Sequence, residues 1–151
     1  ETSAWLMANP SVTDVVVVGG KSVISDDVID ELEAAPYNLN AIRLSGDDRY
    51  ETAYEVAAFA VDMGYLDPDG FTLVSGLNFA DGLAAGPFSM LTGSDGPGPI
   101  LLTKKMELSQ AVMDYFADWT DVSRPSYVVG GESAVSNTVF RKFLDLYKMP
   151  M

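Results

Sequence analysis

The stretch "DVVVVGGKSVIS", residues 14–25, places a β-branched run directly before a Gly-Gly turn and a serine. This order is typical of a strand that turns tightly into a helix, because glycine tolerates the backbone angles of such a turn. Gly20-Lys21-Ser22 also matches the end of the phosphate-loop pattern G-x-x-x-x-G-K-[ST], but Val15 stands where that pattern needs its first glycine. The stretch therefore predicts a strand-to-helix turn rather than a phosphate site.

A second version of the stretch, "YVVGGESAVS", occupies residues 127–136, with Glu132 in the place of Lys21. The offset between the two copies is constant, 130 − 19 = 111 residues, and it relates Gly19, Gly20, Ser22, Ser25 and Val28 to Gly130, Gly131, Ser133, Ser136 and Val139. This self-similarity indicates an internal repeat. We expect residues 41–151 to form one complete repeat and residues 1–40 to form the last part of a preceding one, with a strand at 14–20 and a helix at 25–35. We also expect the two parts to pack as a single α/β domain cut from a longer tandem array.

Short apolar runs alternate along the chain with segments of helical spacing. The runs are "VVVVGG", "AIRLSG", "FTLVSG", "PILLT" and "SYVVGG". Strands that alternate with helices of about ten to fifteen residues favour βαβ crossovers. The sequence therefore predicts an α/β fold with a mostly parallel sheet.

Composition excludes several classes of function. The chain of 151 residues has no histidine and no cysteine, and its formal net charge is −13. Disulfides, thiolate metal sites and the usual histidine general base are thereby excluded. Polyanions attract basic surfaces, so the charge argues against nucleic acid and against an anionic membrane, and no apolar run approaches the roughly 18 residues of a membrane span. We expect no cofactor.

Two helix starts carry candidate binding residues. Asp48 is expected to cap a helix that continues with Arg49 and Tyr50, and "GLNFADGLAAGP", residues 76–87, is expected to open a helix capped by Asn78 with Asp81 in its first turn. We predict a structural ion pair from Arg49 to a carboxylate on a neighbouring loop, with Asp81 as the first candidate, because a cation at a helix start is unfavourable unless a carboxylate pairs with it. In the alternative, Arg49 and Tyr50 face a ligand at the strand ends.

Further charged residues invite two other interpretations. Lys104-Lys105 follow the apolar "PILL", residues 99–102, and could meet an anionic polymer or simply lie in solvent. The acidic stretch "DPDGF", residues 67–71, departs from the calcium-loop pattern at its third ligand position. We therefore expect no metal site, and we interpret the acidic pairs as helix caps and solubilising charge.

Four segments in order, "RLSGDDRYETAYEVA", "VSGLNFADGLAAGP", "PILLT" and "YVVGGESAVS", resemble the bacterial cell-wall-binding repeat, type 2, of Gram-positive surface proteins. The resemblance covers essentially all of residues 41–151. It implies a Rossmann-like three-layer sandwich, a tandem-repeat module that associates in threes, and a non-catalytic, extracellular role in holding a surface protein to an anionic wall polymer of the teichoic-acid type or another peptidoglycan-linked glycopolymer. Neighbouring repeats or a homotrimer would supply the threefold arrangement.

In this resemblance the "PILL" positions are connected with anchoring. An anionic partner would then need a local basic cluster, formed by Arg43, Arg49, Lys104 and Lys105, or bridging divalent cations. The full set of predicted ligand-binding residues is Arg43, Asp48, Arg49, Tyr50, Asn78, Asp81, Pro99, Ile100, Leu101, Leu102, Lys104 and Lys105. Two alternatives stay open: a small-ligand or nucleotide-binding α/β domain, and a wall-polysaccharide hydrolase with Asp48 and Asp81 as its carboxylate pair.

Overall fold

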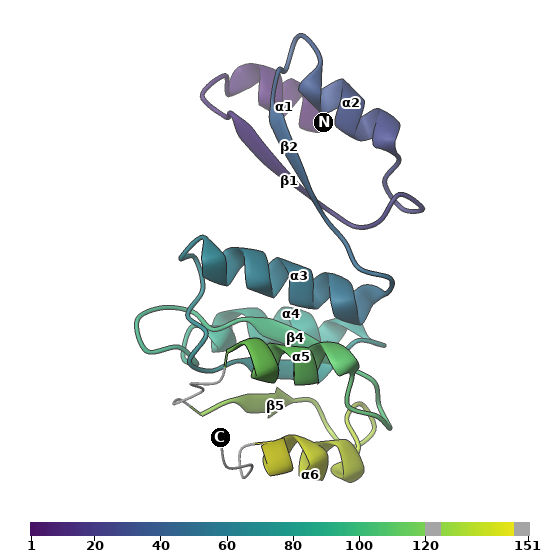
Figure 1. Ribbon diagram of the computed structural model, residues 1–151, viewed down its shortest axis with the longest axis vertical. Coiled ribbons are helices and arrows are strands. Elements are labelled where there is room, and N and C mark those ends of the chain that lie inside the picture. Colours follow the sequence, from purple (N-terminus) through teal and green to yellow (C-terminus); the bar gives the residue numbers. More distant parts are fainter. Residues whose placement is uncertain (120–124, 147–151) are drawn as a thin grey trace. The chain divides into compact units, whose positions relative to one another are not determined.

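The computed structural model describes residues 1–119 and 125–146. The chain divides into two compact units, Glu1–Asp47 and Asp48–Met151, and most of their helices and strands are labelled in Figure 1. The predicted repeat boundary between residues 40 and 41 falls at the start of a strand of the first unit.

The first unit pairs two parallel strands. Its elements are α1 (Thr2–Ala8), β1 (Asp14–Val18), α2 (Asp26–Glu33) and β2 (Asn40–Leu44). β1 and β2 are in register with Val16 opposite Ile42 and Val17 opposite Arg43. The small core contains Leu6, Val17, Leu39 and Leu44.

The second unit contains a three-stranded parallel sheet. Its elements are α3 (Arg49–Asp62), β3 (Thr72–Ser75), α4 (Phe79–Ser89), β4 (Ile100–Thr103), α5 (Gln110–Asp118), β5 (Tyr127–Val129) and α6 (Asn137–Leu146). The strand order is β4-β3-β5, and every strand pair is parallel. The α/β class and the parallel pairing predicted from the sequence are confirmed.

Alternating side chains of β3 divide the second unit into layers. Leu73 belongs to the buried core together with residues of α3, α5 and α6, whereas Val74 points to the opposite face, where its Cγ2 lies 3.8 Å from a Cβ built on Gly82 of α4. Figure 1 accordingly shows α4 behind the sheet and α5 in front of it. Helices therefore cover both faces of the sheet.

Aromatic rings dominate the core on the α5 face. Phe71, just before β3, is fully buried, and its ring meets those of Tyr115, Phe116 and Phe143 edge to face at centroid distances of 5.3, 5.4 and 5.6 Å. Such edge-to-face pairs add to the stabilisation that apolar burial alone provides. β3 is thereby held against both α5 and α6.

The strand order also determines where loops gather. The chain leaves the central β3 for β4 on one side and later returns to β5 on the other side. In open α/β sheets, ligands bind outside the carboxyl ends of the strands at such a reversal. The carboxyl end of β3 is therefore the first place to look for a site.

Candidate functional site

A hollow of about 520 Å³ lies at the carboxyl end of β3. Its wall is formed by the segment from Ser75 to Phe79, by Gly82 and Leu83 of α4, by Leu102 of β4 and by Arg49 of α3. Apolar side chains make up much of this wall, and Arg49 is its cation. A few polar groups on an apolar wall are the usual composition of a binding site.

Side-chain caps fix the two helix starts beside the hollow. Asp48 Oδ1 accepts hydrogen bonds from the backbone N–H groups of Tyr50 and Glu51 at 2.8 and 3.0 Å, and Asn78 Oδ1 accepts one from Ala80 N at 3.1 Å. Both predicted caps are confirmed. The Asp48 carboxylate is therefore committed to the start of α3.

Arg49 ties α3 to the loop after β3. Its Nη1 donates to the carbonyl oxygen of Gly76 at 2.7 Å. The predicted ion pair with Asp81 is wrong: these two residues, both in the described part of the chain, do not form one. Asp81 instead lies beside the second Gly-Gly turn, where its Oδ2 is 2.9 Å from a Cβ built on Gly130. Arg49 is therefore not neutralised by the carboxylate of Asp81; its partner is the backbone carbonyl of Gly76.

Tyr50 and Gly76 pack closely. A Cβ built on Gly76 would lie 2.5 Å from Cε1 of the Tyr50 ring, so no side chain fits there unless the ring moves. The Lys104 ammonium lies 5.8 Å from the centroid of the same ring and 3.5 Å from a carboxylate oxygen of Glu107. Lys104 thus lies near the ring of the buried Tyr50, and Arg49 bonds to the carbonyl of Gly76, which packs against the same ring. Tyr50 was predicted as a binding residue from its position alone.

The "PILL" segment divides its side chains between the two faces of the sheet. Pro99 and Leu101 are buried, and Leu101 belongs to the core of the unit. Ile100 and Leu102 are half-buried, and Leu102 borders the hollow. Lys105 is exposed, and its carbonyl accepts a hydrogen bond from Ser136 N.

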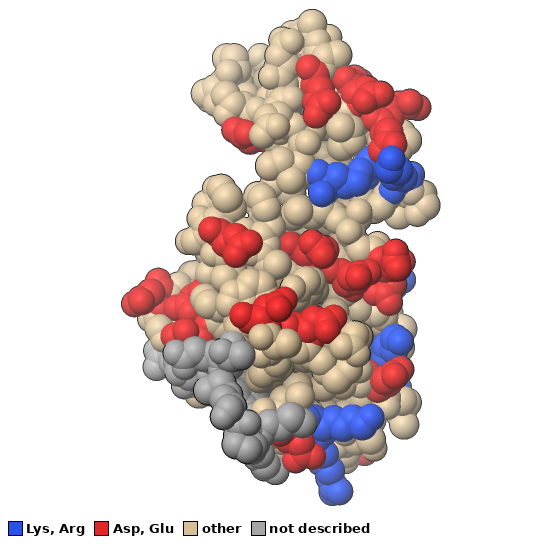
Figure 2. All heavy atoms as spheres, viewed as in Figure 1, with Lys and Arg blue, Asp and Glu red and all other residues tan. Residues whose placement is uncertain are grey.

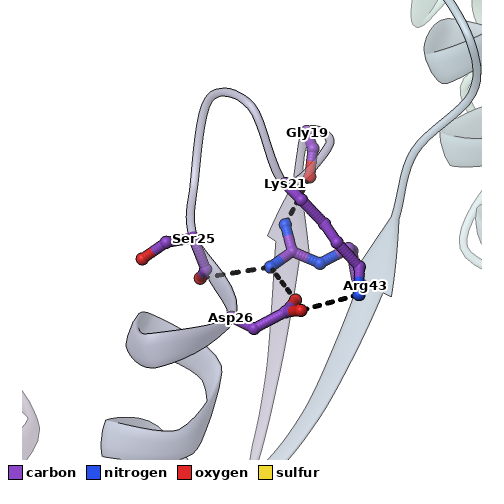
Figure 3. Close-up of polar contacts among 5 residues, drawn as sticks. All are labelled: Gly19, Lys21, Ser25, Asp26 and Arg43. Carbon is purple, nitrogen blue, oxygen red and sulfur yellow. Dashed lines mark hydrogen bonds and ion pairs between the residues drawn. The ribbon is translucent and has the colours of Figure 1, made fainter.

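Arg43 is engaged inside the first unit. Figure 3 shows its guanidinium reaching from β2 over the first Gly-Gly turn, where it donates to Gly19 O at 2.7 Å and to Ser25 O and Asp26 Oδ1 at 3.3 Å. Lys21, exposed on the turn, pairs with the other oxygen of Asp26 at 2.6 Å. The hydrogen bond from Lys21 is the main reason that the pKa of Asp26 is lowered. The Arg43 side chain is only 16% exposed, and its guanidinium is held by these acceptors, so Arg43 is a structural residue of this unit.

Acidic side chains dominate the face of the second unit shown in Figure 2, with basic ones toward its border. Within residues 1–119 and 125–146, no cluster of three acidic side chains is arranged to hold a metal ion. In the same described ranges, no helix has the length and apolar character needed to cross a membrane.

Sequence reasoning missed three parts of the site: Gly76, Phe79 and Leu83. Phe79 and Leu83 are 79% and 71% exposed and stand four residues apart at the start of α4. The i, i+4 spacing indicates that the two side chains share one face of α4. Which way that face points relative to the sheet depends on tertiary packing, and the sequence alone does not give it.

Comparison with known proteins identifies the relatives of this arrangement. The family described as "Cell wall binding domain 2 (CWB2)" matches residues 43–140. The N-acetylmuramoyl-L-alanine amidase LytC of Bacillus subtilis is 30% identical over 129 residues, which are 85% of this chain and 23% of the amidase. The chain thus spans less than a quarter of that protein.

Two solved structures share the fold. Cwp8 from Clostridium difficile superimposes with a TM-score of 0.67 at 26% identity, covering 91% of this chain and 21% of Cwp8. Cwp6 from the same organism gives a TM-score of 0.68 at 23% identity, covering 89% of this chain and 20% of Cwp6.

Proposed function

The chain belongs to the cell wall binding domain 2 family, and from this premise we propose that it is a non-catalytic module that anchors a secreted surface protein to an anionic cell-wall polymer. The proposed polymer is of the teichoic-acid type, which joins phosphate groups to polyol or sugar units. The observation that carries this proposal is the hollow at the carboxyl end of β3, where Arg49 stands beside an apolar wall.

The wall of the hollow suits the carbon skeleton of such a polymer. Phe79, Leu83 and Leu102 offer apolar contacts to the C–H faces of a sugar or polyol, and Asn78 and Ser75 lie at the same wall. A guanidinium carries five N–H donors, so the bond from Arg49 to Gly76 leaves donors for a phosphate oxygen.

The net charge of −13 limits where a polyanion can approach. We expect phosphate groups to be held at the local cations of the second unit, Arg49 and Lys104, with the exposed Lys105 nearby in sequence. Divalent cations in solution would offset the remaining repulsion. The binding should accordingly weaken at high salt.

The family match favours neither of the two alternatives. A hydrolase would need Asp48 as one of two carboxyl groups acting on substrate, but the carboxylate of Asp48 already accepts two backbone N–H groups. The small-ligand or nucleotide alternative uses the loops after Gly46, Gly76 and Gly130, and the hollow beside Gly76 suits a small ligand as well, so the family match is what favours the wall polymer.

A second surface supports assembly of several modules. Met90 and Leu91, just beyond α4, are 61% and 71% exposed. Contiguous exposed apolar side chains mark contact surfaces. We propose that neighbouring repeats, or two further copies of the chain, pack here, and that linked sites raise the avidity for a repeating polymer.

The test is sedimentation of the chain with isolated Gram-positive cell wall, before and after acid extraction of the wall polymers and with or without EDTA. We expect co-sedimentation that is lost on extraction. Loss with EDTA would assign a bridging role to cations. Absence of co-sedimentation for a folded three-repeat chain as well as for this one would refute the proposal.

A matched pair of variants locates the binding surface. Lys104→Gln and Lys142→Gln remove the same charge, but Lys104 lies over Tyr50, whereas Lys142 is exposed on α6. We expect only Lys104→Gln to weaken co-sedimentation clearly. Equal effects of both variants would show that total charge, and not this site, controls binding.

A further inference from the structure

The two Gly-Gly turns have the same backbone conformation. Gly19 and Gly130 have φ angles of 126° and 130°. The carbonyl of Gly20 accepts hydrogen bonds from Val23 N and Ile24 N, and the carbonyl of Gly131 accepts them from Ala134 N and Val135 N. Because the backbone of one turn is repeated at the other, a contact seen at one turn can be sought at the other.

The strands that precede the two turns use opposite edges. In β1, Thr13 O and Gly19 N bond to β2, so the pairing edge carries residues 13, 15, 17 and 19. In β5, Tyr127 N bonds to Phe71 O, so the edge facing β3 carries residues 127 and 129. The backbone groups of alternate residues in a strand bond to opposite neighbours. The backbone N–H and C=O of Val128 therefore point away from β3, toward the outer edge of the sheet. Val128 is the equivalent of Val17, since 128 − 17 = 111.

The two units therefore show complementary halves of one arrangement. We propose that the outer edge of β5 is a docking site for a parallel strand of the β2 type, the first strand of a further repeat, with an arginine opposite Val128. The edge strand of a sheet presents unpaired N–H and C=O groups that a further strand can use. This inference does not depend on which polymer the module binds.

The second turn also offers acceptors for the arginine side chain; we call this group of acceptors at each turn the arginine seat. In the first unit Arg43 stands opposite Val17 and contacts Gly19 O, Ser25 O and Asp26. The equivalent acceptors are Gly130 O and Ser136 O. Among the residues that the structure describes, no donor reaches the Gly130 carbonyl. An arginine on the docked strand would supply one.

The charge around the second seat also favours a cation. In the first unit the pair beside the seat is Lys21 with Asp26; at the equivalent positions Asn137 Nδ2 donates to Glu132 Oε1 at 2.8 Å. The first pair has no net charge, whereas the second has one negative charge. The carboxylate of Asp81 next to Gly130 adds a further negative charge. The surroundings of the second turn are therefore net negative, which favours an arginine, although Asn137 stands where Asp26 gives Arg43 a carboxylate partner.

The experiment extends the whole chain by its own strand. Residues 41–47 are added after Met151, so that their arginine follows Gly130 by the 24 residues that separate Arg43 from Gly19. Amide hydrogen exchange is then measured by NMR. We expect the amide of Val128 to exchange about tenfold more slowly or slower still than in the unextended chain, with a higher Tm for the second unit. Unchanged exchange at Val128 would overturn the proposal.

Two altered extensions test the mode of docking. An extension with Ile42→Pro lacks an N–H on the edge that β2 presents to β1, and should leave Val128 unprotected. An extension with Arg43→Gln should protect Val128 less than the native one. Equal protection by the proline version would overturn the strand pairing, and equal protection by the glutamine version would overturn the arginine seat.

A measurement in trans guards against an effect of the linkage itself. The same seven residues, as a synthetic peptide, are added to the unextended, ¹⁵N-labelled chain. We expect shifts of the amide signals at 127–131 and 136–137, reduced when the chain carries Glu132→Gln. Shifts confined to other parts of the chain would contradict the docking site.

Discussion

Replacing Gly76 by alanine tests the packing that positions the site. The new Cβ would lie 2.5, 3.1 and 3.2 Å from Cε1, Cζ and Cδ1 of Tyr50. The ring has little room to move, because Tyr50 is 9% exposed and Arg49 holds the same loop by its bond to Gly76 O. Overpacking of this kind costs about 1–3 kcal/mol. Restriction of the unfolded chain by alanine offsets roughly 0.4–1 kcal/mol of that cost. We expect a net loss of about 1–2 kcal/mol.

Urea unfolding measures this loss. Trp119 packs against Tyr54 and Tyr115, so its fluorescence in a Trp5→Phe background reports on the second unit. A loss of about 1 kcal/mol lowers the Tm of a unit of this size by roughly 4–8 °C. Gly86→Ala is the matched control, since nothing lies within 4 Å of its Cβ and the residue is inside α4; it should stabilise by about 0.5–1 kcal/mol.

A double-mutant cycle decides whether the Tyr50 ring is the cause. In a Tyr50→Ala background, Gly76→Ala should cost less than about 0.5 kcal/mol, because the contact is gone. The same loss in both backgrounds would refute the packing argument.

Three more outcomes are expected. Leu101→Asp puts a charge into a side chain position that is 1% exposed; it should unfold the second unit, and a native circular dichroism spectrum would contradict its place in the core. The hydrogen bond to Asp118 raises the pKa of Tyr54 from 10.0 to about 12. Because the folded-state pKa of Tyr54 is raised, this hydrogen bond stabilises the folded protein fully below pH 10, and the stabilisation is lost as the pH rises through 12. Ultraviolet titration should show one tyrosine that ionises late, and Asp118→Asn should return the pKa of Tyr54 toward 10. Leu91→Glu should reduce self-association in light scattering, and an unchanged mass in a chain that associates would exclude the surface formed by Met90 and Leu91.

Local signals made the fold predictable. Asp48 and Asn78 cap their helices through residues two or three positions ahead, so the prediction needed no tertiary information. The β-branched run of residues 15–18 and its partner copy fixed two strands in the same way. Parallel pairing followed from the alternation of strands with helices, which leaves each connection long enough for a crossover.

Side-chain partners were harder to predict, because they depend on how elements meet. Arg43 contacts Gly19 only because β1 and β2 pair in one register. From its charge, Arg43 was predicted to bind a ligand, but its acceptors lie within the chain, 17 to 24 residues earlier. Arg49 and Asp81 were placed correctly at two helix starts, but α3 aims Arg49 at the Gly76 carbonyl, and Asp81 lies against Gly130. The division into units at residue 47 likewise left no mark in composition.

The ring cluster around Phe71 affects how this repeat can be cut for study. The segment that matches the family ends at residue 140, whereas Phe143, 1% exposed and in edge-to-face contact with Phe71, lies three residues beyond. A fragment that stopped at the matched limit would lose a buried phenyl ring, and truncations of that size cost about 3–5 kcal/mol. It would also open one side of Phe71 to water. The boundary of sequence similarity is therefore shorter than the cooperative folding unit, and fragments intended for binding assays should retain all of α6.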